Sequence, residues 1–216
     1  MVFIVDSRSR RRFQDAIEQM HQTRRKVFVE RLNWKLRVDE AGREIDEFDT
    51  ADADYMMDID PDSGRLLGSL RLLPTDRAHL LSVHFADLCE TTIPRGEDVR
   101  EISRLVTAPD LPRDRCMRVR HRLASALMEY GLMIGLRSYT LVTHTSWLPT
   151  LLCVGWTCHP LGLPRDRDQQ SIGAMAIEVS QAGLTALRSF GGRYPVLSAP
   201  PRIVQLQTKK EVSYGL

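Results

Sequence analysis

The sequence predicts an α/β fold: a single domain built on a mixed sheet flanked by helices. Strand-like apolar runs alternate along the chain with segments whose apolar residues recur three and four positions apart. A length of 216 residues is enough for one α/β domain with a sizeable core and too short for two comfortable ones. No internal repeat or low-complexity stretch divides the chain. We therefore expect one domain over 1–216, with a loosely packed tail after about residue 191.

The first predicted elements are a strand over 2–5 and a helix over about 8–29. One apolar stripe runs along this helix and contains Phe13, Ile17, Met20, Val27 and Phe28. Arg24 falls on the same stripe, and a guanidinium directed at a core is costly unless a carboxylate meets it. An acidic loop follows, so Asp46 and Asp49 are the expected partners. They form either a structural ion pair that fixes the loop or part of a site.

Two further strands are predicted over 54–60 and 65–73, followed by a short helix over about 82–88. The second strand carries Arg71, which is another arginine directed at an apolar layer.

The next strand, over 99–106, holds a carboxylate and two guanidiniums inside an apolar frame. Strict alternation places Glu101 and Ser103 on one face of it and Arg104 on the other. Both charges reach one pocket only if the strand is bulged or splayed, and we predict such a bulge. Glu101 is then expected to meet Arg24, Arg104 or the amine of a substrate.

The C-terminal half continues the alternation of helices and strands. The expected elements are a helix over 117–135 with a basic start, a strand over 138–144, a helix over about 146–153 and a strand over 172–179.

These segments resemble the N-acyl-homoserine lactone synthases, the family that makes the quorum-sensing autoinducers of Gram-negative bacteria. The resemblance covers nearly the whole chain and rests on the segments VFVERLNW, EIDEFDT, GSLRLLP and EISR. The positions that the family pattern requires are found here as Arg24, Phe28, Trp34, Asp46, Asp49, Arg71, Phe85, Glu101 and Arg104. The resemblance implies the fold of the GCN5-related N-acetyltransferases. The chain has Thr107-Ala108-Pro109-Asp110-Leu111-Pro112 in place of their usual glycine-rich pyrophosphate loop, which argues against an ordinary acetyl-CoA enzyme.

The resemblance implies an acyltransferase that acylates the amine of S-adenosyl-L-methionine from an acyl thioester and then closes the lactone. Methylthioadenosine and the free thiol carrier, acyl carrier protein or CoA, are the other products. S-adenosylmethionine is a substrate, so no cofactor is expected. The alternatives are another acyl-CoA-dependent N-acyltransferase on the same fold and a non-catalytic protein that binds a partner through its arginine-rich helix.

Three residues are expected to take part in catalysis. Glu101 is expected to take the proton of the substrate amine, directly or through water. The other two candidates are Asp46 and Arg104. Lactone closure displaces the sulfonium group internally, so it needs a folded substrate and no nucleophilic side chain.

The residues expected to bind S-adenosylmethionine are Arg24, Phe28, Trp34, Asp46, Asp49 and Arg104. The rings of Phe28 and Trp34 would face the sulfonium, unless both pack in the core. The two aspartates either receive the amino group or hold arginines that grip the carboxylate. Arg71 and Phe85 are expected to support this site from behind.

The acyl chain is expected between the strands 99–106 and 138–144, where this fold opens for its thioester. The expected lining is Ser103, Met128, Leu132, Thr143, Trp147 and Leu152. Ser103 and Thr143 are the polar groups that would meet a 3-oxo substituent, although threonine is also a good strand former. The large apolar residues of this set are equally well explained as core.

The arginines expected to dock the donor are Arg113, Arg115, Arg118, Arg120 and Arg122. A helix start rich in amides and arginines favours anions, so it would hold a phosphopantetheine phosphate or an acidic carrier protein. A solvated helix face is the alternative.

Composition and motifs argue against a nucleic-acid-binding, secreted or membrane protein and against a metal site. The net charge is +2, no nucleic-acid-binding motif is present, and aromatic residues do not interleave with basic ones. No run is long enough for a signal peptide or a membrane span, so a cytoplasmic protein with no membrane partner is expected. The cysteines show no CxxC pairing and are read as buried thiols, and no metal site is expected.

Overall fold

The computed structural model describes residues 1–167 and 170–191. The tail that the sequence predicts to be loosely packed, after about residue 191, lies outside the described residues. The strands are β1 (Val2–Val5), β2 (Asp54–Ile59), β3 (Leu66–Pro74), β4 (Val99–Thr107), β5 (Ser138–His144), β6 (Cys158–Pro160), β7 (Arg165–Arg167) and β8 (Gln170–Glu178). They form one sheet in the order β1-β2-β3-β4-β5-β8-β6, and β7 also pairs with β8. The β4–β5 pair is parallel and its neighbours are antiparallel, so the mixed sheet is confirmed.

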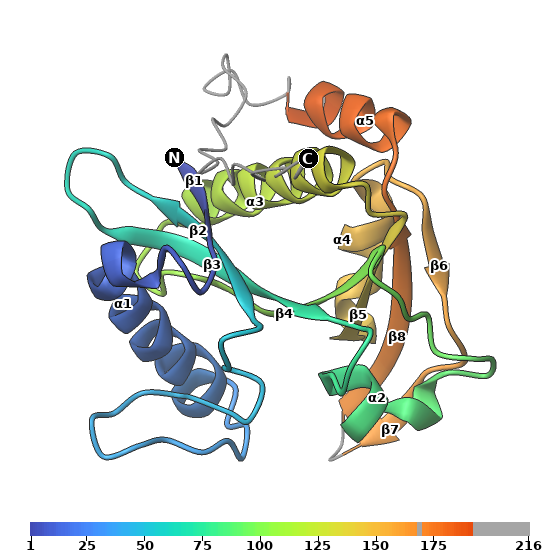
Figure 1. The fold of residues 1–216 in the computed structure, drawn as a ribbon, viewed down its shortest axis with the longest axis horizontal. Coiled ribbons are helices and arrows are strands. Elements are labelled where there is room, and N and C mark those ends of the chain that lie inside the picture. Colours follow the sequence, from blue (N-terminus) through green and yellow to red (C-terminus); the bar gives the residue numbers. More distant parts are fainter. Residues whose placement is uncertain (168–169, 192–216) are drawn as a thin grey trace, which may run out of the picture.

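The helices are α1 (Gln14–Arg24), α2 (Leu80–His84), α3 (Arg113–Ile134), α4 (Leu148–Cys153) and α5 (Gln181–Gly191). Figure 1 shows α1 and α3 on opposite sides of the sheet. Alternate residues of the strands face the two layers, as the period of two requires. Met56 and Leu70 join the cluster around α3, whereas Tyr55, Met57 and Leu73 pack in the cluster that faces α1. The predicted α/β architecture with flanking helices is therefore confirmed.

The predicted first helix is divided into three parts. A 3-10 turn over Arg10–Phe13 precedes α1, and a π-helical turn, η2 (Arg25–Arg31), follows it. At its end the amide of Leu32 donates to the carbonyl of Val27 at 3.0 Å, which is the five-residue step of a π-helix. The wider turn ends α1 at Arg24 and redirects the chain into the loop that precedes β2.

Strand β4 has both irregularities that its charges imply. Its pairing with β3 shifts between Ser69 and Arg71, so that one additional residue is accommodated on β4. Arg104 lies in this bulge with φ +54°, the left-handed region that a residue with a Cβ rarely adopts. On its other side, β4 pairs with β5 only from Val99 to Ile102, although both strands continue further. The two strands therefore diverge, and the predicted bulge and splay are confirmed.

Some elements differ from those expected. Three elements were not predicted from the sequence: β6, β7 and α5. β6 and β7 have three residues each, which is too short for a periodic signal. α3 begins at Arg113, earlier than expected, because Pro112 at its N-cap starts the helix.

The cysteines are free thiols, but Cys153 is exposed and none of the four is fully buried, so the expectation of buried thiols was wrong.

The described part of the chain contains no helix long and apolar enough to cross a membrane. Within the same residues, no group of three His, Cys, Asp or Glu side chains is arranged to hold a metal ion.

Candidate active site

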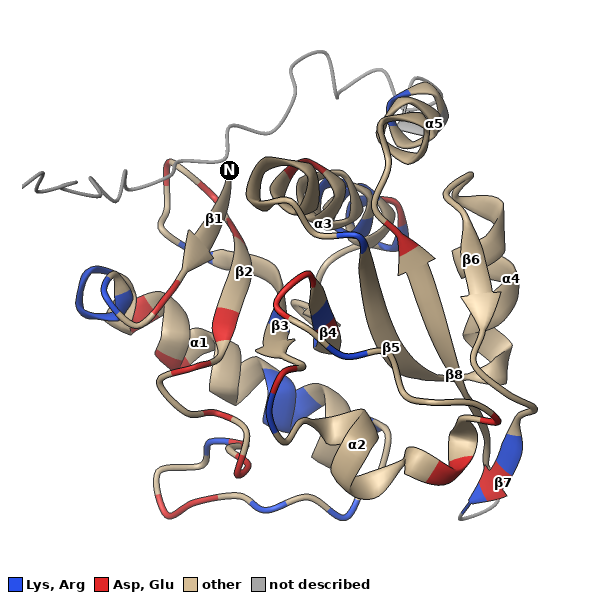
Figure 2. Ribbon diagram, turned by 45° about the vertical axis from the view of Figure 1, so that its right-hand side comes forward, with Lys and Arg blue, Asp and Glu red and all other residues tan. Residues whose placement is uncertain are grey.

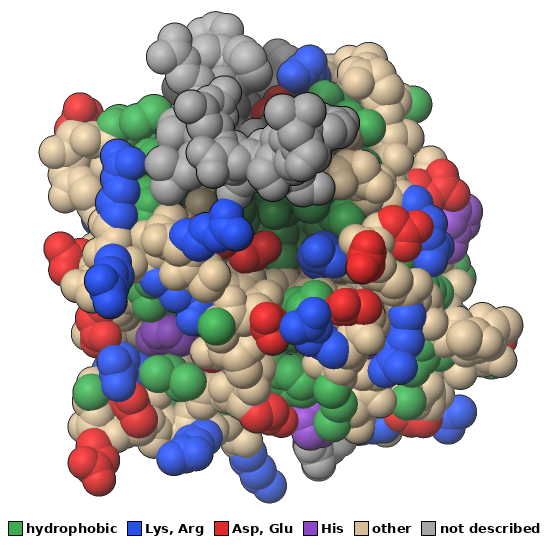
Figure 3. Space-filling view, in the orientation of Figure 1, with side chains coloured by type: hydrophobic (Ala, Val, Ile, Leu, Met, Phe, Trp, Pro, Cys, Tyr) green, Lys and Arg blue, Asp and Glu red, His purple; other side chains and the backbone are tan. Residues whose placement is uncertain are grey.

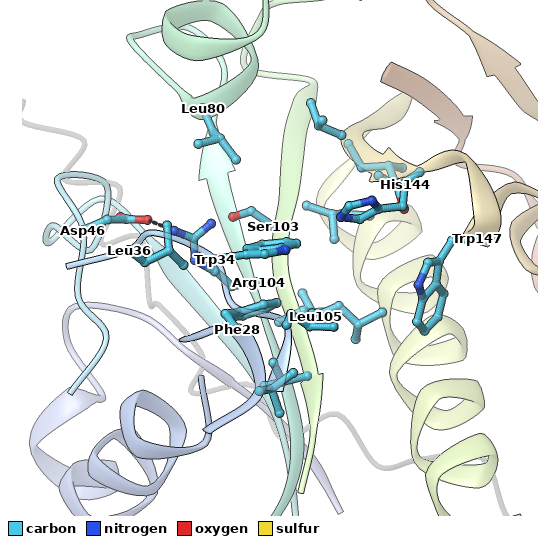
Figure 4. Close-up of a pocket in the computed structure, with 18 of the residues that line it drawn as sticks. Phe28, Trp34, Leu36, Asp46, Leu80, Ser103, Arg104, Leu105, His144 and Trp147 are labelled. Atoms are coloured by element: carbon cyan, nitrogen blue, oxygen red, sulfur yellow. Dashed lines mark hydrogen bonds and ion pairs between the residues drawn. The ribbon is translucent and has the colours of Figure 1, made fainter. Parts of the chain in front are cut away.

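A cavity of about 1480 Å³ lies where β4 and β5 diverge. Its walls come from η2 and the following loop, from β4 and β5, and from one side of α3. Figure 4 shows charged residues on the side of the loop and aromatic and aliphatic residues toward β5 and α3. The volume is large for a single drug-sized ligand, so it is compatible with two substrates bound together.

Behind one wall, Arg24 is completely buried and its guanidinium is fully paired. Its two terminal nitrogens donate to the two carboxylate oxygens of Asp49, both at 2.8 Å, and its Nε donates to Glu44. Asp49 also accepts the hydroxyl of Tyr55 and the backbone amide of Asp46, each at 2.9 Å. Burial alone raises the pKa of Asp49, but the hydrogen bonds and charge of Arg24 hold it well below its usual value. The predicted Arg24–Asp49 pair fixes the acidic loop against α1.

Asp46 continues this network toward the cavity. It accepts hydrogen bonds from Arg71 at 2.5 and 3.0 Å and from Arg104 at 2.8 Å. The side chains of Asp46 and Arg104 are 13% and 8% exposed and line the cavity, whereas Arg24, Asp49 and Arg71 do not line it. The structure thus separates a buried layer that holds the loop from a pair that can touch a ligand.

The sequence interpretation missed Glu44, which is central to this network. Its carboxylate is buried and bonds both Arg24 and Arg104, the latter at 3.0 Å. A count of hydrogen-bond donors and acceptors in the sequence could have found it. The three inward-directed arginines (Arg24, Arg71 and Arg104) require more acceptor oxygens than two aspartates supply, and Glu44 begins the same acidic run. Figure 2 shows acidic and basic residues along this loop between α1 and β2.

An aromatic column crosses the cavity from this network to β5. The guanidinium of Arg104 lies 5.6 Å from the ring centroid of Phe28, which stacks on Trp34 at 4.8 Å with an angle of 17°. The backbone amide of Trp34 donates to the carbonyl of Phe28 at 2.8 Å, which fixes the two residues together. The other side of Trp34 meets His144 at 5.7 Å, and Figure 4 shows this arrangement. Phe28 thus stacks on Trp34 and the tilted ring of His144 lies beside it, so a cation would gain room on Trp34 if His144 moved.

Glu101 is fully buried below α2 and does not line the cavity. One of its oxygens accepts the backbone amide of Leu81 at 2.8 Å, and Oε2 has no hydrogen-bond partner among the described residues. Burial raises its pKa to about 7. It forms no ion pair with Arg24 or Arg104 within the described chain, which leaves the amine of a substrate as the remaining expected partner. The two arginines are unavailable because Glu44 and the two aspartates already use their donors.

The predicted support residues lie where they can act on the wall. Arg71 donates from Nε to the hydroxyl of Ser103 at 3.0 Å, so it links Asp46 to β4. Phe85 lines the cavity, and the guanidinium of Arg167 lies 5.3 Å from its ring centroid.

Half of the expected acyl lining is in place. Ser103, Thr143 and Trp147 line the cavity, whereas Met128, Leu132 and Leu152 do not. Neighbouring residues take their place, because sequence spacing did not specify which side of α3 or α4 faces inward. Those neighbours are Leu123, Ala124, Leu127 and Leu151. Leu152 is 55% exposed, and Met128 is buried on another side of α3.

The five arginines expected to dock a donor do not share one surface. Arg115 pairs with Asp60, Arg118 with Asp114 and Arg122 with Asp58, the last carboxylate being fully buried. Arg113 is exposed at the start of α3, and Arg120 lines the cavity. These pairings and the inward position of Arg120 leave no continuous basic surface of all five arginines. On the face of the molecule drawn in Figure 3, both signs of charge are interspersed.

Comparison with known proteins identifies relatives over most of the chain. The model of the autoinducer synthase family matches residues 8–187. The isovaleryl-homoserine lactone synthase of Bradyrhizobium diazoefficiens is 27% identical over 188 residues, which cover 87% of this chain and 84% of that protein. The acyl-homoserine-lactone synthase of Ralstonia nicotianae is 31% identical over 170 residues, covering 76% of this chain and 82% of the relative.

Solved structures give the same result. A CoA-dependent acyl-homoserine lactone synthase, BjaI, with SAM and isopentyl-CoA, superposes with a TM-score of 0.83 at 28% identity, over 95% of this chain and 92% of that chain. An acyl-CoA N-acyltransferase from Pseudomonas aeruginosa has a TM-score of 0.57 at 16% identity, over 82% of this chain and 97% of that one, and shares the fold alone. Because the family model matches most of this chain, residues 8–187, the chain belongs to the autoinducer synthase family.

Proposed function

We propose that the chain is an acyl-homoserine-lactone synthase, which makes a quorum-sensing signal from S-adenosylmethionine and an acyl thioester. The observation that carries this is the cavity between the splayed strands β4 and β5, with Asp46 and Arg104 on one wall. This wall offers a carboxylate and a guanidinium side by side, which suits the ammonium and carboxylate of an amino acid.

In this proposal the buried residues position the ones that touch the substrate. Arg24 and Asp49 hold the acidic loop, and Arg71 holds Asp46. Arg104 then binds the substrate carboxylate and Asp46 its amino group. The rings of Phe28 and Trp34 lie beside this pair, where they receive the adenosyl sulfonium once His144 has moved away from Trp34.

The first step joins the two substrates. The amine nitrogen attacks the thioester carbonyl, the new C–N bond replaces the C–S bond, and the sulfur leaves as a thiol. The amine gives up its proton, and we assign Glu101 as the acceptor through water, because it lies two residues before Ser103 on the same face of β4. A pKa of about 7 suits such a base at neutral pH.

The second step closes the ring. A carboxylate oxygen of the acylated substrate attacks the carbon that bears the sulfonium, the C–S bond breaks, and methylthioadenosine leaves with its electron pair. No side chain forms a bond in this step. The wall contributes by holding the substrate folded, since intramolecular displacement depends on attack geometry.

The donor is an acyl thioester of CoA or of acyl carrier protein. The similarity to solved synthases described as CoA-dependent favours CoA. The apolar part of the cavity, with Leu127, Leu141 and Trp147, is the proposed place of the acyl chain. We place the enzyme in the cytoplasm, where both substrates are made, and expect no further cofactor because S-adenosylmethionine supplies the leaving group.

The test is thiol release from acyl-CoAs of graded chain length, measured with and without S-adenosylmethionine. The proposal predicts release of the CoA thiol only when S-adenosylmethionine is present. Equal release without it would indicate a thioesterase, and release with other amines in its place would indicate a different N-acyltransferase.

A further inference from the structure

Arg31 and Arg120 are two of the arginines that line the cavity outside the acidic network. Arg31 is the last residue of η2 and is exposed, and Arg120 lies half-buried on α3. Neither forms an ion pair or hydrogen bond with another residue of 1–167 or 170–191, in contrast to Arg118 and Arg122 on the same helix. Arg120 is half-buried, and a guanidinium that is partly removed from water is costly without an anion.

The surroundings of Arg120 orient its donors. Its guanidinium lies over the ring of Trp147, 4.6 Å from the centroid, and Figure 4 shows Trp147 beside α3. A guanidinium that lies over a ring face keeps N–H groups available for a bidentate oxyanion. Burial lowers the pKa of Arg120, and the positive charge of Arg31 lowers it further, so the two cations lie close enough to repel each other.

The face of α3 continues from this charge into an apolar surface. Arg120, Leu123, Ala124 and Leu127 all line the cavity, at the three- and four-residue spacing of one helical face. A ligand along this face would place an anionic group at Arg120 and an apolar arm beside the leucines. Lys35 and Arg37, on the loop after η2, add further cations to the lining.

We propose that Arg31 and Arg120 form an anion site for the phosphate that ends the pantetheine arm of the acyl donor. This inference rests on the proposed function and assigns the donor side of the same cavity. The phosphate is common to acyl-CoA and to acyl carrier protein, so either donor would use the site. Arg31 was not among the docking arginines expected from sequence, because it lies outside the basic helix start.

The experiment compares three donors with the same acyl group: acyl-CoA, acyl-4′-phosphopantetheine and acyl-pantetheine, which has no phosphate. The variants are Arg120→Gln and Arg31→Gln, with Arg137→Gln as the control, since Arg137 is an exposed arginine beyond the end of α3 that pairs with Asp98 and does not line the cavity. Each of the first two changes is expected to raise KM about 10-fold for both phosphate-bearing donors. KM for acyl-pantetheine, affinity for S-adenosylmethionine and all constants of the control are expected to stay unchanged.

Three results would overturn the assignment. In the first, KM for acyl-CoA is unchanged in both variants. In the second, KM rises equally for acyl-pantetheine, which would mean that the arginines only shape the cavity. In the third, KM rises for acyl-CoA alone, which would mean that the site binds the nucleotide phosphates. Arg31→Gln alters an exposed residue, so its result stands even if Arg120→Gln fails to fold. Failure of the proposed function is distinct, because the unmodified enzyme would then form no lactone with any donor.

Discussion

At the scale of single residues, Glu101 is fully buried, and one of its carboxyl oxygens has no hydrogen-bond partner in the described chain. Its pKa is raised by burial from 4.5 to about 7. The folded state therefore holds this proton more tightly than the unfolded state, and the resulting stabilisation is complete below about pH 4.5 and lost as pH rises through 7.

The first prediction concerns Glu101→Gln, which stays neutral at every pH and keeps an acceptor for Leu81. The variant is expected to match the wild type in stability near pH 4.5 and to exceed it by on the order of 2–3 kcal/mol at about pH 8. Urea denaturation across this range measures the difference. A variant much less stable than the wild type at pH 8 would mean that the charge of Glu101 is needed in the fold.

The same variant tests the proposed base. Glu101→Gln is expected to bind both substrates and to acylate about 10²- to 10⁴-fold more slowly, with part of the rate recovered at higher pH as the amine deprotonates in solution. Single-turnover kinetics separates this step from binding. A near wild-type rate in the folded variant would remove Glu101 from catalysis.

Trp34 offers a second prediction at this scale, because it contacts Phe28 and His144 and is only partly buried. Trp34→Ala is expected to lower affinity for S-adenosylmethionine about 2- to 30-fold while the melting temperature changes little. His144→Ala gives a cation more room on the ring and is expected to keep affinity at or above that of the wild type. Calorimetric titration decides, and parallel losses of affinity and stability in Trp34→Ala would make the ring a core residue.

At the scale of elements, the acidic loop is held to α1 through Asp49, which meets both Arg24 and Arg71. Asp49→Asn leaves two buried guanidiniums short of a counter-charge and is expected to cost about 3–5 kcal/mol of stability at neutral pH. Since the pKa of Asp49 is lowered in the fold, its contribution is present above its ordinary value and is lost on acidification, so the variant should lack this acid sensitivity.

The control for this change is Asp52→Asn. Asp52 pairs with Arg77 on the surface, where both side chains are more than half exposed, so a change within about 1 kcal/mol is expected. Equal losses in the two aspartate variants would contradict a special role for the buried network.

The elements also show what sequence can and cannot predict. The bulge in β4 was predicted from the requirement that Glu101 and Arg104 reach one pocket, and the bulge is present although only Arg104 lines the cavity. β5 was predicted at its observed bounds by its apolar alternation. The short strands β6 and β7 were not predicted because three residues carry no measurable period. The π-helical turn η2 was not predicted either, because its apolar residues follow the stripe of α1.

At the scale of the whole molecule, the charged site was more predictable than the apolar one. A buried arginine needs a carboxylate, so Arg24 pointed to Asp46 and Asp49 from the sequence alone. Apolar residues carry no such pairing rule, and Leu127 lines the cavity where Met128 was expected. The five donor arginines do not share one surface for a related reason: helix α3 distributes them around its axis, and two of them pair with carboxylates of a distant segment.

The most direct test of the central claim uses purified enzyme with an acyl-CoA and S-adenosylmethionine labelled with oxygen-18 in both carboxylate oxygens. Internal attack of the carboxylate on the carbon bearing the sulfonium retains both labels, so mass spectrometry should find doubly labelled N-acyl-homoserine lactone together with an equal amount of methylthioadenosine. Absence of lactone, or acylated product that accumulates without methylthioadenosine, would contradict the account.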